Sequence, residues 1–184
     1  MPCFTSGTFI TTLRGEKPAE ELAVGDRVIT RDNGLQTVRQ IFRRGYDYGQ
    51  LSVVPHLQPV LVTAGAMGKG LPERDMLCSP NLRLLTDRDR SPFGQEIPGQ
   101  REALVPVKNL RRGSMIRNCS VLGIGYILIE FDQHEVVLAN GCWAEAFCLG
   151  DPSLGARGNA QRTEIHEIFP DRKPAMPARR AIDG

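Results

Sequence analysis

The sequence predicts an all-β fold, and three observations support this prediction. Short runs of β-branched and aromatic residues recur along the chain, with turn residues between them. The periodicity of amphipathic helices is almost absent. Two segments also echo each other at a constant offset: Pro18, Leu22, Gly25 and Val28, then Pro106, Leu110, Gly113 and Ile116. Each set predicts a strand, one helical turn, a glycine turn and another strand, as a duplicated β-structure would contain.

The first predicted elements follow a cysteine. Cys3 precedes small hydroxyl residues and a β-branched run that ends at Thr12, which places it at the head of a strand. Gly15 and Gly25 supply turns on either side of a short helical segment, expected from Pro18 to Leu22.

A hairpin is expected next. Residues 27–31 predict a strand, and Asp32-Asn33-Gly34 predicts a tight turn. Polar and apolar residues alternate over 36–42, which predicts the antiparallel partner strand. Residues 45–49, with two tyrosines between glycines, predict a loop.

The middle of the chain predicts short strands and long turns. A strand is expected over 59–63, followed by a glycine-rich loop over 65–72. Segments 76–80 and 83–85 predict a short bent strand pair. The stretch 86–100 is rich in Asp, Arg, Pro and Gly and predicts an exposed loop.

The last predicted strands precede a change in composition. After the second copy of the echo, residues 125–131 predict a strand, with 135–139 as its partner across the turn 132–134. We therefore expect one domain over residues 1–150 and a polar, basic, loosely ordered tail over 151–184. Within the tail, only Ile165 to Phe169 is apolar enough to dock, as one small turn.

Composition limits the classes of function. The chain has 184 residues, 41% of them apolar, which suffices for a core of ordinary size. Its net charge of +2 indicates no acidic partner, so no nucleic-acid partner is expected. We find no apolar run long enough for a membrane span and no signal peptide at the start, so no membrane partner is expected either. The sequence indicates no particular compartment, and we expect a monomer.

The cysteines and histidines do not predict a metal site. The five cysteines form neither a CxxC pair nor a zinc-type spacing, and the three histidines are widely scattered. We therefore expect no metal and no cofactor. The odd number of cysteines fits a free thiol better than a closed set of disulfides.

The opening block resembles that of the Hint family, the self-processing domains shared by hedgehog proteins and inteins. It begins Cys3-Phe4-Thr5-Ser6-Gly7-Thr8 and is similar to bacterial Hint domains that begin Cys-Phe-Thr-x-Gly-Thr. The resemblance implies a horseshoe of short strands with internal pseudo-twofold symmetry, in agreement with the echo. It also implies that Cys3 attacks the carbonyl of the preceding residue and converts that peptide bond into a thioester. A thiol is well suited to this attack because it is a better nucleophile than a hydroxyl.

A second block departs from the family at one position. The segment Ser79-Pro80-Asn81-Leu82 is similar to the Ser-Pro-x-His block of Hint domains, with Ser79 at the hydroxyl position. Leu82 stands where the family has a histidine that holds and protonates the scissile amide. A leucine does neither, and acid–base catalysis is typically worth ~10²–10⁴ in rate. The resemblance therefore implies a slow or absent reaction, unless another group substitutes for the histidine.

The closing block resembles that of Hint domains at Ala139-Asn140-Gly141, and His134 lies at its expected start. Asp132, two residues earlier, is a candidate to orient the His134 imidazole. The alternative is a structural role, in which His134 lies at the end of a hairpin and binds a neighbouring backbone group. Glu145-Ala146-Phe147 stands where an intein has its terminal histidine, asparagine and nucleophile, so no splicing is expected.

Two functions of different classes follow. In the first, the chain is a self-processing domain that cleaves its own upstream polypeptide at Cys3, with Ser79, His134 and Asp132 in the site. Pro2 adds a restraint, because its ring restricts the backbone on the acyl side. In the second, it is a degenerate Hint fold that serves as a structural or interaction module. A redox role for Cys3 has only the cysteine count in its favour.

Overall fold

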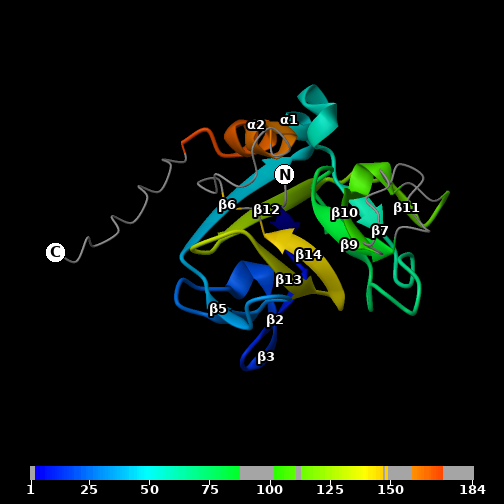
Figure 1. Ribbon diagram of the computed structural model, residues 1–184. Coiled ribbons are helices and arrows are strands. Elements are labelled where there is room, and N and C mark those ends of the chain that lie inside the picture. Colours follow the sequence, from blue (N-terminus) through cyan, green and yellow to red (C-terminus); the bar gives the residue numbers. More distant parts are fainter. Residues whose placement is uncertain (1–2, 88–101, 111–112, 147, 149–158, 172–184) are drawn as a thin grey trace.

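The computed structural model describes residues 3–87, 102–110, 113–146, 148 and 159–171. Their elements form three antiparallel sheets and a few short helices (Figure 1). The strands of the first half are β1 (Phe4–Thr5), β2 (Phe9–Thr12), β3 (Gly15–Pro18), β4 (Arg27–Ile29), β5 (Leu35–Thr37), β6 (Gln40–Asp47), β7 (Val60–Val62), β8 (Met76–Cys78) and β9 (Arg83–Asp87). Those of the second half are β10 (Glu102–Pro106), β11 (Ile116–Asn118), β12 (Gly123–Glu130), β13 (Glu135–Ala139) and β14 (Cys142–Ala146). The expected all-β fold is confirmed.

The strand order joins the two ends of the sequence. The largest sheet has the order β10-β9-β14-β13-β2-β4-β5, with β3 paired to β2. A second sheet has the order β1-β12-β6, and a third has the order β11-β7-β8. β1 pairs with β12 so that Phe4 lies opposite Ile127. The start of the chain is therefore held by strands from its last third.

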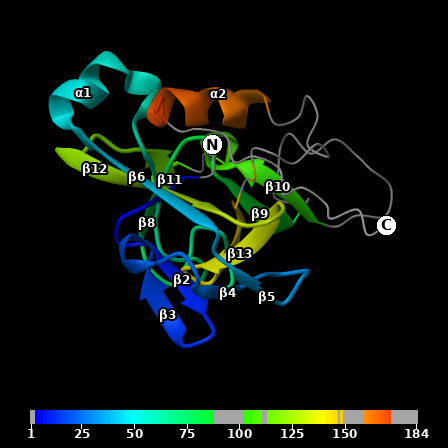
Figure 2. The same cartoon turned by 90° about the vertical axis from the view of Figure 1, so that its left-hand side faces the viewer.

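The two α-helices described lie together at one end of the molecule. The α-helices are α1 (Tyr48–Val53) and α2 (Asn159–Ile168), and the 3₁₀ turns are η1 (Ala19–Glu21), η2 (Pro55–Leu57) and η4 (Val107–Asn109). Figures 1 and 2 both show α1 and α2 on one side of the long β6–β12 pair, with β2 to β5 at the opposite side. The helices thus cover an end of the strands that would otherwise be open.

The echo in the sequence corresponds to two turns that begin with the same geometry. Pro18 precedes η1 with φ −56° and ψ 137°, and Pro106 precedes η4 with φ −57° and ψ 133°. Proline fits here because its fixed φ matches the first turn and its missing N–H costs no hydrogen bond. Gly25 and Gly113 then adopt positive φ, at 96° and 53°, a region that glycine enters without strain. The starts of η1 and η4 are therefore alike, whereas their ends differ: Leu22 has ψ 144° and Leu110 has ψ 13°.

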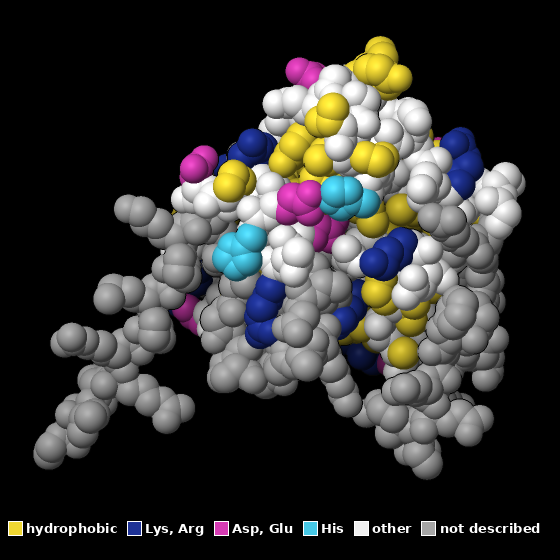
Figure 3. Space-filling model, turned by 90° about the horizontal axis from the view of Figure 1, so that it is seen from above, with side chains coloured by type: hydrophobic (Ala, Val, Ile, Leu, Met, Phe, Trp, Pro, Cys, Tyr) yellow, Lys and Arg dark blue, Asp and Glu magenta, His cyan; other side chains and the backbone are white. Residues whose placement is uncertain are grey.

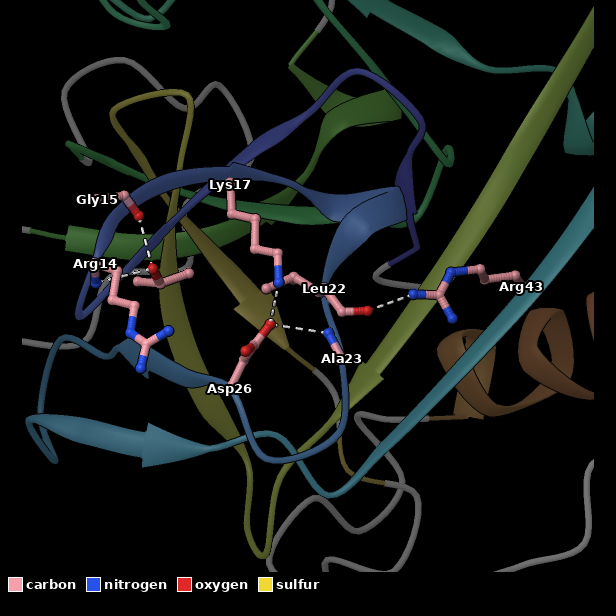
Figure 4. A network of polar contacts seen from close by, with 8 residues as sticks. Arg14, Gly15, Lys17, Leu22, Ala23, Asp26 and Arg43 are labelled. Atoms are coloured by element: carbon pink, nitrogen blue, oxygen red, sulfur yellow. Dashed lines mark hydrogen bonds and ion pairs between the residues drawn. The ribbon is translucent and has the colours of Figure 1, made fainter.

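Polar contacts close the first of these turns (Figure 4). The Asp26 carboxylate accepts hydrogen bonds from Lys17 Nζ at 2.8 Å and from the Ala23 N–H at 2.9 Å. The hydrogen bond from Lys17, followed by that from Ala23, lowers the pKa of Asp26. Arg43 Nη2 donates to the Leu22 carbonyl at 2.5 Å and so ties the turn to β6. Hydrogen bonds from β3 and from β6 therefore fix this turn.

Some predicted strand pairs are wrong. The expected partner strand over 36–42 is split: β5 pairs with β4, whereas β6 turns away to pair with β12. β12 and β13 are adjacent in sequence but lie in different sheets, and β8 and β9 also have different partners. The expected loop 45–49 instead contains the end of β6 and the start of α1, where Asp47 caps the helix. The loop expected over 86–100 lies almost wholly outside the described residues.

The tail contains a docked helix rather than one small turn. In α2, Glu164, Ile165 and Ile168 are buried, as is Phe169 just beyond it. Tyr46 Oη donates to the Ile168 carbonyl at 3.3 Å, which ties the helix to β6. The apolar residues lie three and four positions apart, the spacing of one helix face. The expectation of a loose tail is therefore wrong for residues 159–168.

Truncating a buried residue of α2 is expected to destabilise the whole domain. Ile165 is fully buried, so Ile165→Ala is expected to lower the free energy of unfolding by about 2–4 kcal/mol in urea denaturation. The matched control is His166→Ala, an exposed neighbour, for which a change within about 0.5 kcal/mol is expected. Equal stability of the two variants would contradict the docked position of α2.

Two clusters of buried residues form the core. The larger one lies between the sheets and includes Phe4 and Leu82. The smaller one lies under the helices and contains Cys3, Tyr126, Ile165 and other residues of β6 and β12. Cys3 is therefore packed beneath α2, which follows β14 in the sequence.

Candidate functional site

Cys3 is clamped to Ser79 by two hydrogen bonds. The Cys3 N–H donates to Ser79 Oγ at 3.1 Å, and the Ser79 N–H donates to the Cys3 carbonyl at 3.3 Å. Both residues are fully buried. Next to them, Thr5 Oγ1 donates to the Leu77 carbonyl at 2.6 Å. The opening block and the second block, far apart in sequence, meet at one point, and the nitrogen of the peptide bond before Cys3 is held there.

The second block forms a tight turn whose end faces the main core. The Leu82 N–H donates to the Ser79 carbonyl at 3.0 Å, and the Val107 N–H donates to the Leu82 carbonyl at 2.8 Å. The Leu82 side chain is fully buried in the larger cluster, whereas Cys3 belongs to the smaller one. The turn therefore connects the two clusters, with Ser79 on the side of Cys3 and Leu82 on the side of the core.

Burial dominates the electrostatics of the nucleophile. The Cys3 side chain has no exposed surface, and this burial raises the pKa of its thiol well above the usual value. The negative charge of Glu164 raises this pKa further. The thiolate is the nucleophilic form of cysteine. The surroundings of Cys3 therefore disfavour a free thiolate.

His134 lies in a separate polar group. His134 Nε2 is 2.8 Å from Glu145 Oε1, and Arg83 Nη1 donates to the same oxygen at 3.4 Å. Asp132 does not fill the orienting role proposed for it, because it is exposed and bound to Arg39 Nη2 at 2.7 Å. Glu145, fully buried on β14, is the carboxylate that orients the imidazole. Of the four candidate site residues, the structure joins Cys3 to Ser79.

The Asn-Gly of the closing block makes the β13–β14 turn. Asn140 and Gly141 both adopt positive φ, at 46° and 78°, as a two-residue hairpin turn requires. The Phe9 N–H donates to Asn140 Oδ1 at 2.9 Å, and the Asn140 N–H donates to the Phe9 carbonyl at 2.9 Å. Asn140 thus ties the closing block to the opening block and has a structural role.

A family model described as Hint domain matches residues 2–151, which include every strand that the structure describes. The chain belongs to the Hint family. Comparison with curated protein sequences gave no match.

The comparison with solved structures found an intein-like domain and inteins. The chain is similar to the bacterial intein-like domain from Clostridium thermocellum, with 14% sequence identity and a TM-score of 0.51 over 80% of this chain and 99% of that one. It is also similar to the gp41-1 intein, with 14% identity and a TM-score of 0.46 over 78% of this chain and 98% of that one. The first of these likenesses supports the all-β Hint fold.

Sequence reasoning missed one part of this Hint domain, the residues of α2 beside Cys3. Glu164 is 4% exposed, and its Oε2 accepts a hydrogen bond from Asn81 Nδ2 at 2.5 Å. Glu164 precedes the apolar Ile165, and the helical spacing of Ile165, Ile168 and Phe169 was the signal available in the sequence. Asn81 belongs to the turn that begins at Ser79, so the Hint domain places a buried carboxylate close to its clamp.

A cavity opens beside this carboxylate. Its volume is about 470 Å³, and it lies between η2, the turn at Pro80 and Asn81, and α2. Its polar lining includes His56, Lys108, Glu164 and Glu167. A small molecule or an extended peptide can reach the Hint domain from this side.

Neither a metal site nor a membrane span is found in the described part of the Hint domain. No group of three or more His, Cys, Asp or Glu side chains there is arranged to hold a metal ion. None of the helices described is both long and apolar enough to cross a membrane.

Proposed function

We propose that this Hint domain cleaves the peptide bond before Cys3 by an N–S acyl shift. The Cys3 sulfur attacks the carbonyl carbon of the preceding residue, and the acyl group passes from the Cys3 nitrogen to the sulfur as a thioester. Water or another nucleophile then releases the upstream segment. The substrate is the domain's own upstream polypeptide, and the domain acts as a monomer without a cofactor.

The clamp between Cys3 and Ser79 carries this proposal. The Cys3 nitrogen is the leaving group of the reaction, and its N–H donates to Ser79 Oγ at 3.1 Å. A hydrogen bond at this nitrogen fixes the orientation of the scissile amide relative to the thiol of the same residue. Holding reacting groups in place removes much of the entropic part of a barrier.

Two departures from the family pattern support cleavage without splicing, at a reduced rate. Glu145-Ala146-Phe147 replaces the residues with which an intein would cyclise an asparagine and release its downstream segment. Leu82 replaces the family histidine, so the imidazole that would protonate the scissile nitrogen is missing. The reaction therefore stops at release of the upstream segment, and it is slow.

A second candidate function rests on Leu82. Its side chain is fully buried in the main core and strengthens the packing there. A chain that has exchanged a catalytic imidazole for core packing is suited to serve as a structural or interaction module. The experiment below separates the two functions.

A fusion protein tests the proposal. A folded carrier is joined upstream of Pro2 and Cys3, and the fusion is incubated at neutral pH with dithiothreitol or hydroxylamine. These reagents trap a thioester even when little of it is present, so weak release of the carrier is expected by mass spectrometry. Pro2→Gly is expected to accelerate release, because it frees the backbone on the acyl side. No release from the parent or from the Pro2→Gly, Leu82→His double variant would favour the structural module.

A further inference from the structure

Glu164 is a buried carboxylate that the packing of α2 holds in place. It is 4% exposed, and its neighbour Ile165 belongs to the same buried cluster as Cys3. Burying a carboxylate is costly unless hydrogen bonds compensate. Asn81 Nδ2 supplies such a bond to Glu164 Oε2 at 2.5 Å. Because burying this carboxylate is costly and α2 lies outside the Hint strands, we infer that Glu164 has a functional role.

The position of Glu164 is tied to the scissile bond through the second block. Asn81 lies two residues after Ser79, in the turn closed by the Leu82 N–H and the Ser79 carbonyl. Ser79 Oγ in turn accepts the hydrogen bond from the Cys3 N–H. One short turn therefore binds both the scissile amide and the carboxylate.

Glu164 also acts on the thiol through its charge. After burial, which has the larger effect, the negative charge of Glu164 raises the pKa of Cys3. It acts on the Tyr126 hydroxyl in the same direction, again after burial. A fixed negative charge here opposes formation of a thiolate. It favours attack only if it takes the thiol proton itself, because the charge of the pair then stays constant.

We propose that Glu164 carries the proton in the cleavage reaction, in place of the histidine that Leu82 has replaced. This inference rests on the proposed function. It assigns to α2, which follows the Hint strands, the acid–base group of the site.

Each step of the proposed cycle balances. As the Cys3 sulfur bonds to the carbonyl carbon, the thiol proton moves to the Glu164 carboxylate, and the carbonyl oxygen becomes an oxyanion. When the bond from that carbon to the Cys3 nitrogen breaks, the nitrogen takes the proton from the Glu164 carboxylic acid. The products are a thioester, a free amine and the original carboxylate. One group thus serves as base and then as acid.

The cavity gives the second half-reaction access to the same carboxylate. Glu164 lines the cavity of about 470 Å³ beside α2, so an acceptor such as water arrives next to it. Figure 3 shows this face of the molecule, where acidic side chains lie beside histidine at the surface. In this half-reaction Glu164 takes the proton of the acceptor as the acceptor attacks the thioester, and that proton passes to the Cys3 sulfur when the carbon–sulfur bond breaks.

Other charged groups lie in the same region, so a pH-dependent measurement must distinguish their effects from that of Glu164. Lys108 of η4 and His56 of η2 line the cavity, and His56 Nε2 is bound to Glu167 Oε1 at 2.6 Å. The charge of Glu164 also acts on Cys3, which precedes β1, and on Tyr126 of β12. Among these groups, Glu167 is the matched comparison, since it lies one turn further along the same helix.

The test compares Glu164→Gln with Glu167→Gln in the carrier fusion. Glutamine keeps the shape of the side chain and an oxygen for Asn81, but it accepts no proton. Glu164→Gln is expected to slow thiol-induced cleavage by about 10²-fold and to remove the acidic limb of the pH–rate profile. Glu167→Gln is expected to stay within about twofold of the parent and to keep that limb. Cleavage by Glu164→Gln at the parent rate, with the parent pH profile, would overturn the proposal.

A second measurement does not depend on cleavage. The infrared S–H stretching band of Cys3 is isolated as the difference between the parent and Cys3→Ala, and the same difference is recorded in the Glu164→Gln and Glu167→Gln backgrounds. Because a carboxylate is a stronger acceptor than an amide, the band is expected to shift with Glu164→Gln alone. Failure of the parent fusion to cleave would contradict the proposed function. The S–H band would still show, independently of cleavage, whether the Cys3 thiol contacts Glu164. An unshifted band would exclude the proton contact.

Discussion

Replacing Cys3 by alanine is expected to abolish release of an upstream carrier, with or without added thiol. The Cys3 sulfur is the atom that forms the thioester, and alanine leaves no nucleophile at the clamped position. The fold is expected to survive, because alanine is only slightly smaller than the fully buried cysteine. Mass spectrometry of the incubated fusion measures the outcome, and urea denaturation checks the fold.

The control for this variant is another cysteine. Cys119 is partly exposed, and Cys119→Ala is expected to leave the cleavage rate unchanged. Release that persists in Cys3→Ala and needs no added nucleophile would refute a thioester mechanism. Loss of release in both variants would instead point to a general requirement for thiols.

Installing histidine at position 82 is expected to raise cleavage by about 10²-fold, the low end of the ~10²–10⁴ range typical of acid–base catalysis. The same change is expected to lower the free energy of unfolding by about 2–4 kcal/mol, because Leu82 is fully buried among apolar side chains. Rates from the carrier fusion and stability from urea denaturation together test the prediction.

Leu84→His is the matched control for this substitution. Leu84 is equally buried in the same cluster and lies two residues further along the chain, in β9. Its replacement is expected to cost similar stability without any gain in cleavage. A rise in cleavage in both variants would show that loosening of the core, rather than the imidazole, accelerates the reaction.

The local turn chemistry of this chain could be predicted from its sequence, whereas the long-range pairing of its strands could not. Pro18 and Pro106 restrict their own backbones, so the two echoed turns follow from local sterics. The partner of a strand depends on contacts across the whole chain. The apolar run of β12 therefore does not reveal that it pairs with β1 and β6 rather than with β13.

The site was predictable to the same limited extent. Cys3 and Ser79 follow from the blocks that resemble the family, and the clamp between them agrees with that alignment. Asp132 was a misleading neighbour, because two residues along a turn do not place its side chain on His134. Glu164 was missed because α2 lies in a segment whose average composition is polar, and a few buried residues on one helix face do not change that average.

The pairing of β1 with β12 has a consequence for the timing of the reaction during protein synthesis. Cys3 leaves the ribosome before the rest of the domain, yet Phe4 and Thr5 find their partners only at Ile127 and Tyr126. Ser79 and then Ile165, which share the surroundings of Cys3, are also made much later. The thiol therefore has no assembled site until these later segments have been made. A domain built this way delays cutting until α2 has been translated.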